Sequence, residues 1–368
     1  MSQLFSALKL GPLQLSNRVI IAPMCQYSAN KGQASDWHTI HLGGLALSGA
    51  GLLILEATAI SPQARISYGD LGLWDDATEQ ALAKTLKIIR QYSTMPIGIQ
   101  LAHAGRKAST EKPWMGGQAI APSDVNGWQT IGPSAIAYDE ASFPPKAASV
   151  KDLQDIVKDF VEAAKRAEKI GLNVIELHAA HGYLLHQFLS PLSNQREDDY
   201  GGSAENRMRL LLEVFDAVKS AVSSSMTVGV RISASDWVEG AWDLAQSEVL
   251  AQALQLRQCD YLHVSSGGLS AEQKIPVGPG YQLHFAQALK KVVSMPVIAV
   301  GLITEAEQAE QIISGAQADA VALARAMLYN PHWVWQAAEK LGATVQIPAQ
   351  YLRSEPRGTK RHLFKTDP

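Results

Sequence analysis

Short apolar, β-branched segments alternate with longer helical segments from one end of this 368-residue chain to the other. The expected strands are Arg18–Met24, Gly51–Thr58, Ile97–His103, Asn173–His178, Thr227–Ile232, Tyr261–Ser265, Val297–Gly301 and Ala320–Ala324. They are nearly continuous hydrophobic runs, as parallel strands buried on both faces are. About eight strand–helix units predict a closed (β/α)8 TIM barrel, an α/β fold in a single domain. An open, doubly wound sheet is the alternative, but it would leave edge strands that a barrel avoids.

Helical patterns follow the strands, and two of them have a recognisable start. The clearest helices are expected at Asp76–Tyr92, Val150–Ile170, Arg207–Val222 and Glu305–Ser314. Ser149 with Asp152, and Thr304 with Glu307, have the spacing of a capping box, in which two side chains satisfy free backbone N–H groups. We therefore expect helices to begin directly after Ser149 and Thr304.

Two connections, after strands three and four, are too long to be simple turns. They are Lys107–Ala148, rich in Gly, Pro and Trp, and the polar Gly182–Asn206. Loops after the carboxyl ends of barrel strands build active sites, so both are expected to border the site. We expect residues 1–353 to form the barrel and residues 354–368 to form a basic, flexible tail.

Charge and hydropathy exclude several classes of protein. The chain has 32 Lys and Arg against 35 Asp and Glu, a net charge of −3, which gives no sign of a nucleic-acid partner. No apolar stretch reaches the ~20 residues of a membrane span, and the N-terminal residues do not have the pattern of a secretory signal. Because two cysteines suit a reducing compartment, we expect a cytoplasmic protein without a membrane partner.

A pair of histidines, His178 and His181, ends strand four, where both rings are expected to face the barrel mouth. They suit two hydrogen-bond donors for a carbonyl or oxyanion, a metal site with His103, or a structural role. Metal is the weaker choice, because strand eight ends in Arg325, a poor ligand for a cation. Glu176 is two residues before His178, so both side chains are expected on the same face of strand four. A glycosidase would require a second carboxylate nearby, and none ends strand seven.

Glycines and an arginine end the last three strands. Gly267 and Gly268 follow strand six, Gly301 ends strand seven and Arg325 follows strand eight. Glycine lets backbone N–H groups approach an anion, and arginine holds phosphate with a planar guanidinium group. These residues predict a site for a phosphorylated ligand, whereas neither a Rossmann fingerprint nor a P-loop occurs in the sequence.

Arg231 lies within strand five, where a buried guanidinium is costly unless an anion or a polar ring meets it. A structural salt bridge is one interpretation. The other is a flavin, whose reduced ring is negative near N1 and O2, and whose edge Gln100 would also meet through its amide. Cys25 follows strand one at this rim, whereas Cys259 precedes strand six at the opposite end, so no disulfide between them is expected.

Four motifs carry a resemblance to a known family. Residues 193–207 (SNQREDDYGGSAENR) are the most specific, and the others are residues 23–27 (PMCQY), 100–106 (QLAHAGR) and 178–183 (HAAHGY). Together they resemble the Old Yellow Enzyme family of FMN-dependent ene-reductases, in particular the bacterial xenobiotic reductases with a cysteine after strand one. The resemblance extends from about Leu4 to Arg353.

The resemblance implies a bound FMN, with NADPH or NADH as the reductant, and roles for particular residues. It implies cofactor binding by Pro23, Met24, Cys25, Ala57, Gln100, Arg231, Gly267, Gly301, Ala324 and Arg325, with the last three at the phosphate. Relatives often have glycine where Ala324 stands, and its methyl group would crowd the phosphate loop. Arg353 matches an arginine that enters a neighbouring subunit's site, which implies a homodimer or homotetramer.

The implied activity is reduction of the C=C bond of α,β-unsaturated carbonyl compounds. His178 and His181 would bind the carbonyl oxygen, Tyr27 would line the pocket, and hydride would pass from the reductant to FMN N5 and then to the β-carbon, with Tyr183 as proton donor. Lacking a Rossmann site, the reductant would share one space with the enone, which predicts ping-pong kinetics. The rivals are a metal-dependent barrel hydrolase using His103, His178 and His181, and a protein that stores FMN without turnover.

Overall fold

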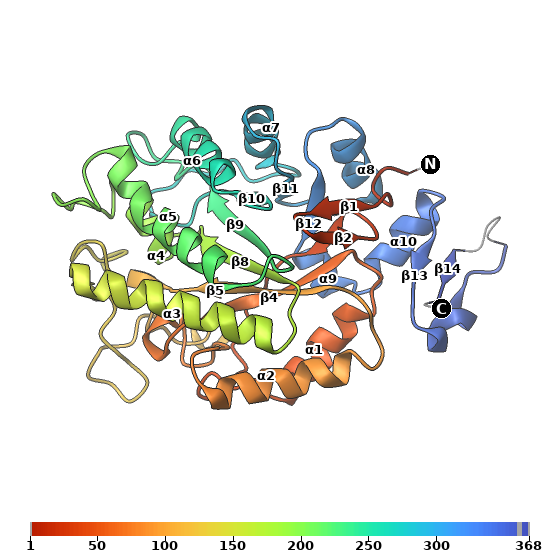
Figure 1. Cartoon of the computed structure of the whole chain (residues 1–368), viewed down its shortest axis with the longest axis horizontal. Helices are drawn as coiled ribbons and strands as arrows, with labels where there is room; N and C mark the ends of the chain where they lie inside the picture. Colours follow the sequence, from red (N-terminus) through yellow and green to blue (C-terminus); the bar gives the residue numbers. More distant parts are fainter. Residues whose placement is uncertain (1, 359–362, 367–368) are drawn as a thin grey trace.

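The computed structural model describes residues 2–358 and 363–366, and its centre is a closed barrel of eight parallel strands (Figure 1). In order around the barrel wall these are β3 (Val19–Ile21), β4 (Leu52–Ala59), β5 (Ile97–Ala102), β8 (Val174–Ala179), β9 (Thr227–Ser233), β10 (Leu262–Ser265), β11 (Val297–Val300) and β12 (Ala320–Leu323). β12 pairs with β3 and closes the barrel. The predicted TIM barrel is confirmed, and every predicted strand lies within three residues of its expected ends.

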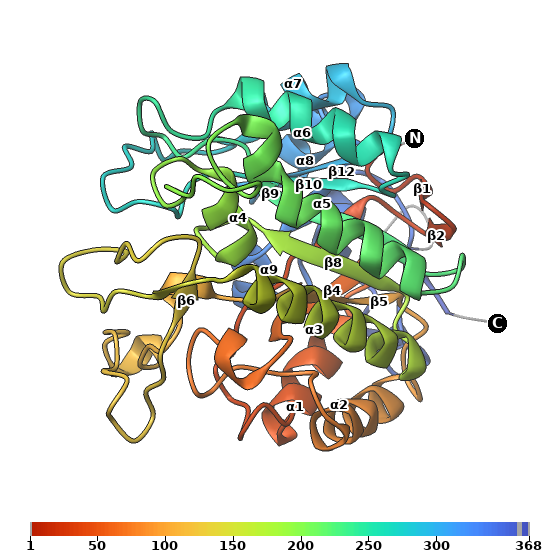
Figure 2. The same cartoon turned by 60° about the vertical axis from the view of Figure 1, so that its left-hand side comes forward.

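Helices surround the barrel on its outer face (Figure 2). They are α1 (Asp36–Ala46), α2 (Asp76–Ile89), α3 (Val150–Lys169), α5 (Ala204–Ala221), α6 (Leu244–Leu256), α7 (Leu283–Val292), α8 (Ala306–Ser314) and α10 (Trp333–Lys340). The short helices α4 (Leu184–Leu189) and α9 (Arg325–Tyr329) follow β8 and β12 directly. No helix in the described part of the chain combines the length and apolarity that crossing a bilayer requires.

One of the two predicted capping boxes is confirmed. Asp152 N donates to Ser149 Oγ at 3.2 Å, and Ser149 N donates to Asp152 Oδ2 at 2.8 Å, at the start of α3. The prediction for Thr304 is wrong, because Glu305 occupies the N-cap of α8. Thr304 N instead donates to Gln308 Oε1 at 3.1 Å, so a glutamine in the first turn of the helix accepts the hydrogen bond from this backbone N–H.

An antiparallel hairpin, which we did not predict, covers the amino-terminal end of the barrel. Its strands are β1 (Leu8–Leu10) and β2 (Leu13–Leu15). Leu10 and Leu15 belong to an apolar cluster with barrel residues such as Ile20 and Tyr261, and Thr227 Oγ1 donates to Leu10 O at 2.9 Å. Because this end of the barrel interior is filled by apolar side chains, the polar interior residues gather toward the carboxyl ends of the strands.

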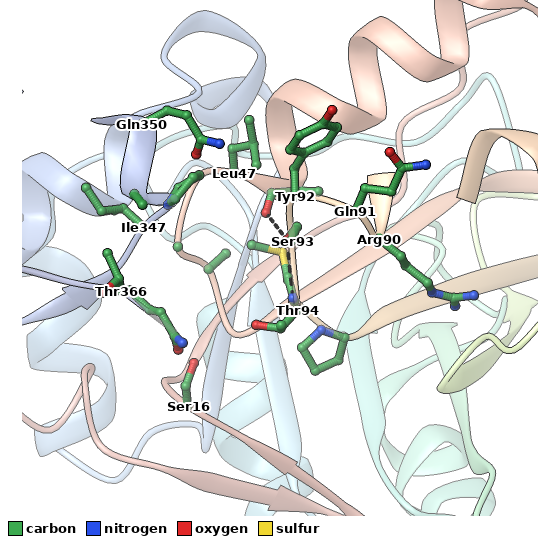
Figure 3. A pocket seen from close by; sticks show the side chains of 18 of the residues that line it. Ser16, Leu47, Arg90, Gln91, Tyr92, Ser93, Thr94, Ile347, Gln350 and Thr366 are labelled. Atoms are coloured by element: carbon green, nitrogen blue, oxygen red, sulfur yellow. Dashed lines mark hydrogen bonds between the residues drawn. The ribbon is translucent and has the colours of Figure 1, made fainter. Parts of the chain in front are cut away.

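The segment after Arg353 is largely exposed at residues 354–358 but packs against the rest of the fold at Leu363 and Phe364. η4 (Ala349–Ser354) is followed by β14 (Phe364–Lys365), which pairs in parallel with β13 (Val345–Gln346). Phe364 is buried against Trp335, with ring centroids 5.3 Å apart. The expected flexible tail is therefore anchored at residues 363–366, while residues 359–362 and 367–368 of the predicted tail lie outside the described residues. A cavity of about 480 Å³ lies beside this segment (Figure 3).

Candidate active site

The long connection after β5 borders a cavity at the carboxyl end of the barrel. It contains the short elements η2 (Gly105–Lys107), η3 (Pro113–Met115), β6 (Ile131–Gly132) and β7 (Lys146–Ala147). The cavity has a volume of about 540 Å³, and Tyr27 and Tyr183 line it together with side chains of this connection. The expectation that the loop after strand three covers the site thus agrees with the lining of this cavity.

His178 and His181 meet at the end of β8. His178 Nε2 and His181 Nδ1 lie 3.4 Å apart, and the two rings are perpendicular with centroids 5.1 Å apart. Burial lowers the pKa of both imidazoles well below the usual value, and Arg231 adds to the effect on each. Both rings are therefore neutral, and each can donate one N–H.

Neighbouring groups define which nitrogen of His178 can donate and allow two tautomers of His181. Ala180 N donates to His178 Nδ1 at 3.3 Å, so neutral His178 has its proton on Nε2, the nitrogen that faces His181. His181 Nε2 lies 2.7 Å from the hydroxyl of Ser265 at the end of β10. Because a hydroxyl both donates and accepts, Ser265 can support either tautomer of His181. When the hydroxyl donates, His181 Nδ1 carries the proton and both rings donate toward the same point.

The backbone around His181 has an unusual conformation that a glycine and a lysine stabilise. His181 has a φ of 56°, and the next residue, Gly182, has a φ of 75°. A Cβ atom on Gly182 would lie 2.1 Å from the carbonyl oxygen of Gly268, so only glycine fits here. Lys107 Nζ donates to His181 O at 2.9 Å and to Gly268 O at 2.8 Å. These contacts join the loops that follow β8 and β10.

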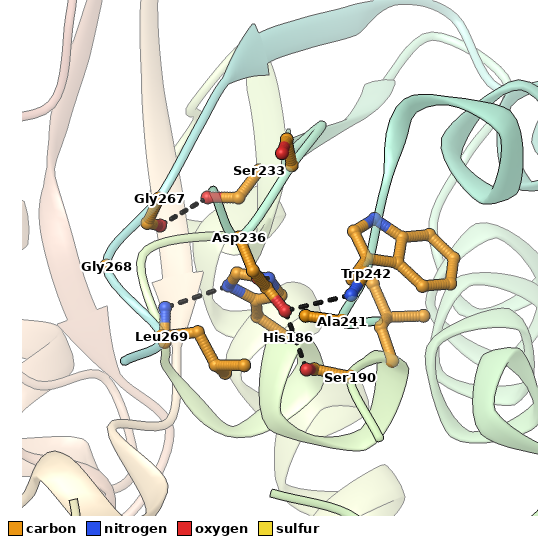
Figure 4. Close-up of polar contacts among 12 residues, drawn as sticks. His186, Ser190, Ser233, Asp236, Ala241, Trp242, Gly267, Gly268 and Leu269 are labelled. Carbon is orange, nitrogen blue, oxygen red and sulfur yellow. Dashed lines mark hydrogen bonds and ion pairs between the residues drawn. The ribbon is translucent and has the colours of Figure 1, made fainter. Parts of the chain in front are cut away.

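A buried contact between His186 and Asp236 supports the same loop from the protein interior. His186 Nε2 lies 2.8 Å from Asp236 Oδ1, and both side chains are inaccessible to solvent. Asp236 Oδ2 also accepts from Ser190 Oγ at 2.6 Å and from Trp242 N at 3.1 Å (Figure 4). His186 Nδ1 accepts from Gly182 N at 2.9 Å, so the network fixes the turn between His181 and Tyr183.

Tyr183 lies beside the histidine pair and remains protonated. Its ring packs against His178 in an edge-to-face arrangement with centroids 4.9 Å apart, and Lys107 Nζ lies 5.4 Å from its centroid. Burial raises the pKa of Tyr183 well above the usual value, and the nearby Cys25 and Tyr27 act in the same direction. A phenol in this position can give up a proton only to a strongly basic atom, such as a developing carbanion.

Cys25 and Tyr27 follow β3 at the same end of the barrel and contact each other. Their side chains are hydrogen-bonded, and both are partly exposed at the barrel mouth. Burial raises the pKa of the Cys25 thiol well above its usual value, and the carboxylates of Asp70 and Glu56 raise it further. Cys25 is thus a thiol rather than a thiolate, which does not suit a nucleophile. Cys259 is buried just before the start of β10, at the end of the barrel opposite to Cys25. Both cysteines are free, as expected.

The surroundings of Arg231 indicate what kind of ligand could bind beside it. The side chain is 7% exposed, and its Nε atom has no hydrogen-bond partner within the described ranges. It is paired in register with His178 on β8 and with His263 on β10. A buried cation with a free donor suits a ligand with a polar, negatively charged edge, which is what a reduced flavin offers. The residues present therefore fit FMN.

The predicted phosphate residues lie at the ends of neighbouring strands. Gly301 follows β11 with a φ of 126°, and Ala324 is the N-cap of α9, so that Arg325 is the first residue of this helix. Tyr281, which sequence analysis missed, interacts electrostatically with both Arg325 and Arg231. Both guanidinium groups oppose the rise that burial causes in the pKa of the Tyr281 phenol.

Other predicted residues lie away from the histidine pair or have different partners. Arg353 is exposed in η4, whose neighbours line the cavity of Figure 3 at the amino-terminal end of the barrel, so this chain's own site is beyond its reach. His103 is buried, and its Nδ1 accepts from Gly105 N at 3.0 Å. Within residues 2–358 and 363–366, no group of three His, Cys, Asp or Glu side chains could hold a metal ion, so the rival hydrolase lacks a ligand set.

Comparisons with known proteins agree with this geometry. Residues 3–343 match the model of the "NADH:flavin oxidoreductase / NADH oxidase family". The chain is 42% identical to an NADPH dehydrogenase of Listeria innocua, covering 96% of this chain and 99% of that protein. It is also 42% identical to an NADH:flavin oxidoreductase of Gibberella zeae, over 95% and 88% of the two chains. Among solved structures, morphinone reductase is similar with a TM-score of 0.77 and 31% identity, over 94% and 91% of the chains. A complex of morphinone reductase with tetrahydroNAD gives a TM-score of 0.75 at 30% identity, over 94% and 92% of the chains.

Proposed function

Because this chain belongs to the NADH:flavin oxidoreductase / NADH oxidase family and is an FMN-dependent NAD(P)H oxidoreductase, we propose that it reduces the C=C bond of α,β-unsaturated carbonyl compounds. The resemblance to the Old Yellow Enzymes is confirmed by the family match and by the morphinone reductase structures. The observation that supports the proposed reaction is the pair of neutral imidazoles, 3.4 Å apart, beside the protonated Tyr183.

The histidine pair activates the substrate in this proposal. An oxygen placed between His178 Nε2 and His181 Nδ1 can lie about 2.9 Å from each nitrogen, the usual length of such a hydrogen bond. Two donors aimed at a carbonyl oxygen stabilise the negative charge that develops there as a nucleophile approaches the β-carbon. Since both rings are neutral, they bind the carbonyl without giving up a proton.

Tyr183 supplies the proton in this proposal. Tyr183 lines the same cavity as Tyr27, which we propose lines the substrate pocket. The raised pKa keeps the phenol protonated at neutral pH, and the carbanion-like α-carbon is basic enough to accept the proton. A positioned general acid of this kind contributes about 10²- to 10⁴-fold to a rate.

The cofactor residues are proposed from the matched motifs and from the fit of Arg231. Residues that would hold the ring are Pro23, Met24, Cys25, Ala57, Gln100 and Arg231, those at the phosphate are Gly301, Ala324 and Arg325, and Gly267 would also contact the cofactor. Bound FMN would supply the hydride chemistry of the reaction, with NAD(P)H as the source of the hydride. The exposed guanidinium of Arg325 is free to meet a phosphate dianion, and the methyl group of Ala324 narrows the approach beside it.

A second subunit is part of the proposal. Arg353 is exposed and far from its own chain's site, so it would act in the cavity of a neighbouring copy within a homodimer or homotetramer. Arg353→Ala should then raise the KM for the enone without changing FMN content. A wild-type KM in this variant, or a protein that sediments as a monomer, would contradict the shared site.

The proposed reaction can be tested by the visible absorption of the purified protein. Anaerobic NADPH should bleach the flavin bands, and 2-cyclohexenone should then restore them. A flavin that bleaches and stays bleached would rule out this enone as the acceptor. The double variant His178→Ala/His181→Ala is the matched control, because it should still be bleached by NADPH but should recover slowly.

A further inference from the structure

A buried carboxylate inside the barrel has no role in the function proposed above. Glu176 on β8 is completely buried and accepts three hydrogen bonds. Its Oε1 accepts from Gln100 Nε2 at 2.7 Å, and its Oε2 lies 3.0 Å from His263 Nδ1 and 3.2 Å from the hydroxyl of Tyr261. These donors come from β5, β10 and the residue before β10, so the carboxylate connects strands from different parts of the barrel wall.

The first contact fixes the orientation of Gln100. Gln100 and Glu176 are paired in register on β5 and β8, and Ala57 is paired with Gln100 on β4. Because the amide nitrogen of Gln100 points to Glu176, its carbonyl oxygen points away from the carboxylate. Gln100 thereby offers an acceptor in a defined direction, which a freely rotating amide would not.

The second contact is electrostatic. Glu176 interacts with the guanidinium of Arg231, whose Nε has no partner in the described part of the chain. Burial alone would raise the pKa of Glu176, but His263, Arg231 and Gln100 together lower it below the usual value, so the group is ionised. His263 is neutral, because burial and Arg231 lower its pKa. One negative and one positive charge therefore lie inside the barrel wall.

We propose that Glu176 is a positioning residue for bound FMN, which orients the Gln100 amide, offsets the charge of Arg231 and so sets the two-electron reduction potential of the cofactor. Reduction adds negative charge to the flavin ring, and an uncompensated guanidinium beside the ring would favour it. The carboxylate opposes this effect, so bound FMN keeps a lower potential and remains a better hydride donor. The inference depends on the proposed placement of Gln100 and Arg231 at the ring, but not on the identity of the enone.

The test is the potential of Glu176→Gln, measured on the holoenzyme against a reference dye with neither NAD(P)H nor enone present. The substitution keeps the shape of the side chain and removes its charge. The potential should become more positive, with the ratio of the FMN dissociation constants of the oxidised and reduced forms rising at least tenfold, ~30 mV for a two-electron couple. Tyr261→Phe is the control, because it removes one hydrogen bond to the same carboxylate and leaves the charge; its ratio should stay within threefold of wild type.

A wild-type potential in Glu176→Gln with full FMN content would overturn the proposal, because a purely structural carboxylate changes stability and not potential. If Glu176→Gln does not fold, the double variant Glu176→Gln/Arg231→Gln decides, since removing both buried charges is better tolerated than removing one. Folding of the double variant alone would support the pairing of the two charges. Failure of both variants would assign Glu176 to the packing of the barrel and overturn the proposal. Enone turnover enters none of these measurements, so their failure is separate from failure of the proposed reaction.

Discussion

Replacing Ser265 with alanine should weaken carbonyl binding through the tautomer of His181. Both histidines can donate to one oxygen only if His178 Nε2 and His181 Nδ1 carry protons. Ala180 N enforces the first condition, and the second requires that His181 Nε2 accept from the Ser265 hydroxyl 2.7 Å away. Without that hydroxyl, the N–H of His178 favours the opposite tautomer, in which His181 Nδ1 is an acceptor. Losing one net hydrogen bond costs about 1 kcal/mol and lowers the fraction of enzyme in which His181 Nδ1 carries the proton. The apparent Kd for the enone should therefore rise about fivefold.

The assay is a titration of oxidised holoenzyme with 2-cyclohexenone, followed by the visible absorption of the flavin. Ser266→Ala is the matched control, because Ser266 is also buried and donates to Gln282 Oε1 at 2.7 Å. Ser265 Oγ can also donate to the same Gln282 oxygen, at a longer 3.3 Å, so its one proton serves either Gln282 or the closer His181, and the two variants differ chiefly at His181. A Kd for Ser265→Ala within twofold of that for Ser266→Ala would refute the tautomer argument.

Three further outcomes are expected. Tyr183→Phe should leave reduction by NADPH unchanged and slow the enone half-reaction about 10²- to 10⁴-fold in stopped-flow measurements, and equal losses in both half-reactions would contradict its role as the acid. Arg325→Ala should weaken FMN binding about ten- to a hundredfold in fluorescence titrations without lowering Tm, and an unchanged Kd would remove it from the phosphate site. Burial lowers the pKa of His103 to about 4, so only the unfolded chain gains this proton as the pH falls below ~6.5, and stability is lost on acidification. In urea unfolding, His103→Gln should abolish about 2 kcal/mol of the stability that wild type loses between about pH 7 and about pH 5, and an unaltered loss would contradict the pKa assignment.

The barrel could be predicted because burial on both faces makes each parallel strand a continuous apolar run. The strand ends were less certain: the first strand was expected to reach Met24 but ends at Ile21, since Pro23 has no N–H for the ladder. The hairpin at the amino-terminal end was missed, although its signal was present. Residues 8–15 read LKLGPLQL, an alternating apolar pattern on both sides of a Gly-Pro turn.

Candidate site residues could be named from the sequence where they belong to a motif at a strand end, as with His178, or where a charge interrupts an apolar strand, as with Arg231. Residues that act through loops from other parts of the sequence could not. Ser265 contacts His181 across 84 positions, and Lys107 reaches the carbonyl of the same histidine across 74. Glu176 was weighed only as a glycosidase carboxylate, because its partners Tyr261 and Gln100 are brought to it by the closure of the barrel. The spacing of residues in the sequence does not predict such contacts. The alternation of side chains along a strand does predict which residues face the barrel interior.

Desolvation sets the charge state of the histidine pair and of Tyr183, the proposed acid. Desolvation disfavours charge, so it lowers the pKa of His178 and His181 and raises that of Tyr183. All three groups are therefore uncharged near pH 7. The two imidazoles can donate hydrogen bonds to an oxygen, and the phenol retains the proton that it would give to the substrate. Two charged groups lie close to them in the barrel wall: Arg231 is level with His178, and Glu176 is two residues earlier on β8. The neutral donors suit an uncharged carbonyl, whereas the guanidinium of Arg231 suits the anionic ring of a reduced cofactor, so the two kinds of group serve different ligands at one barrel mouth.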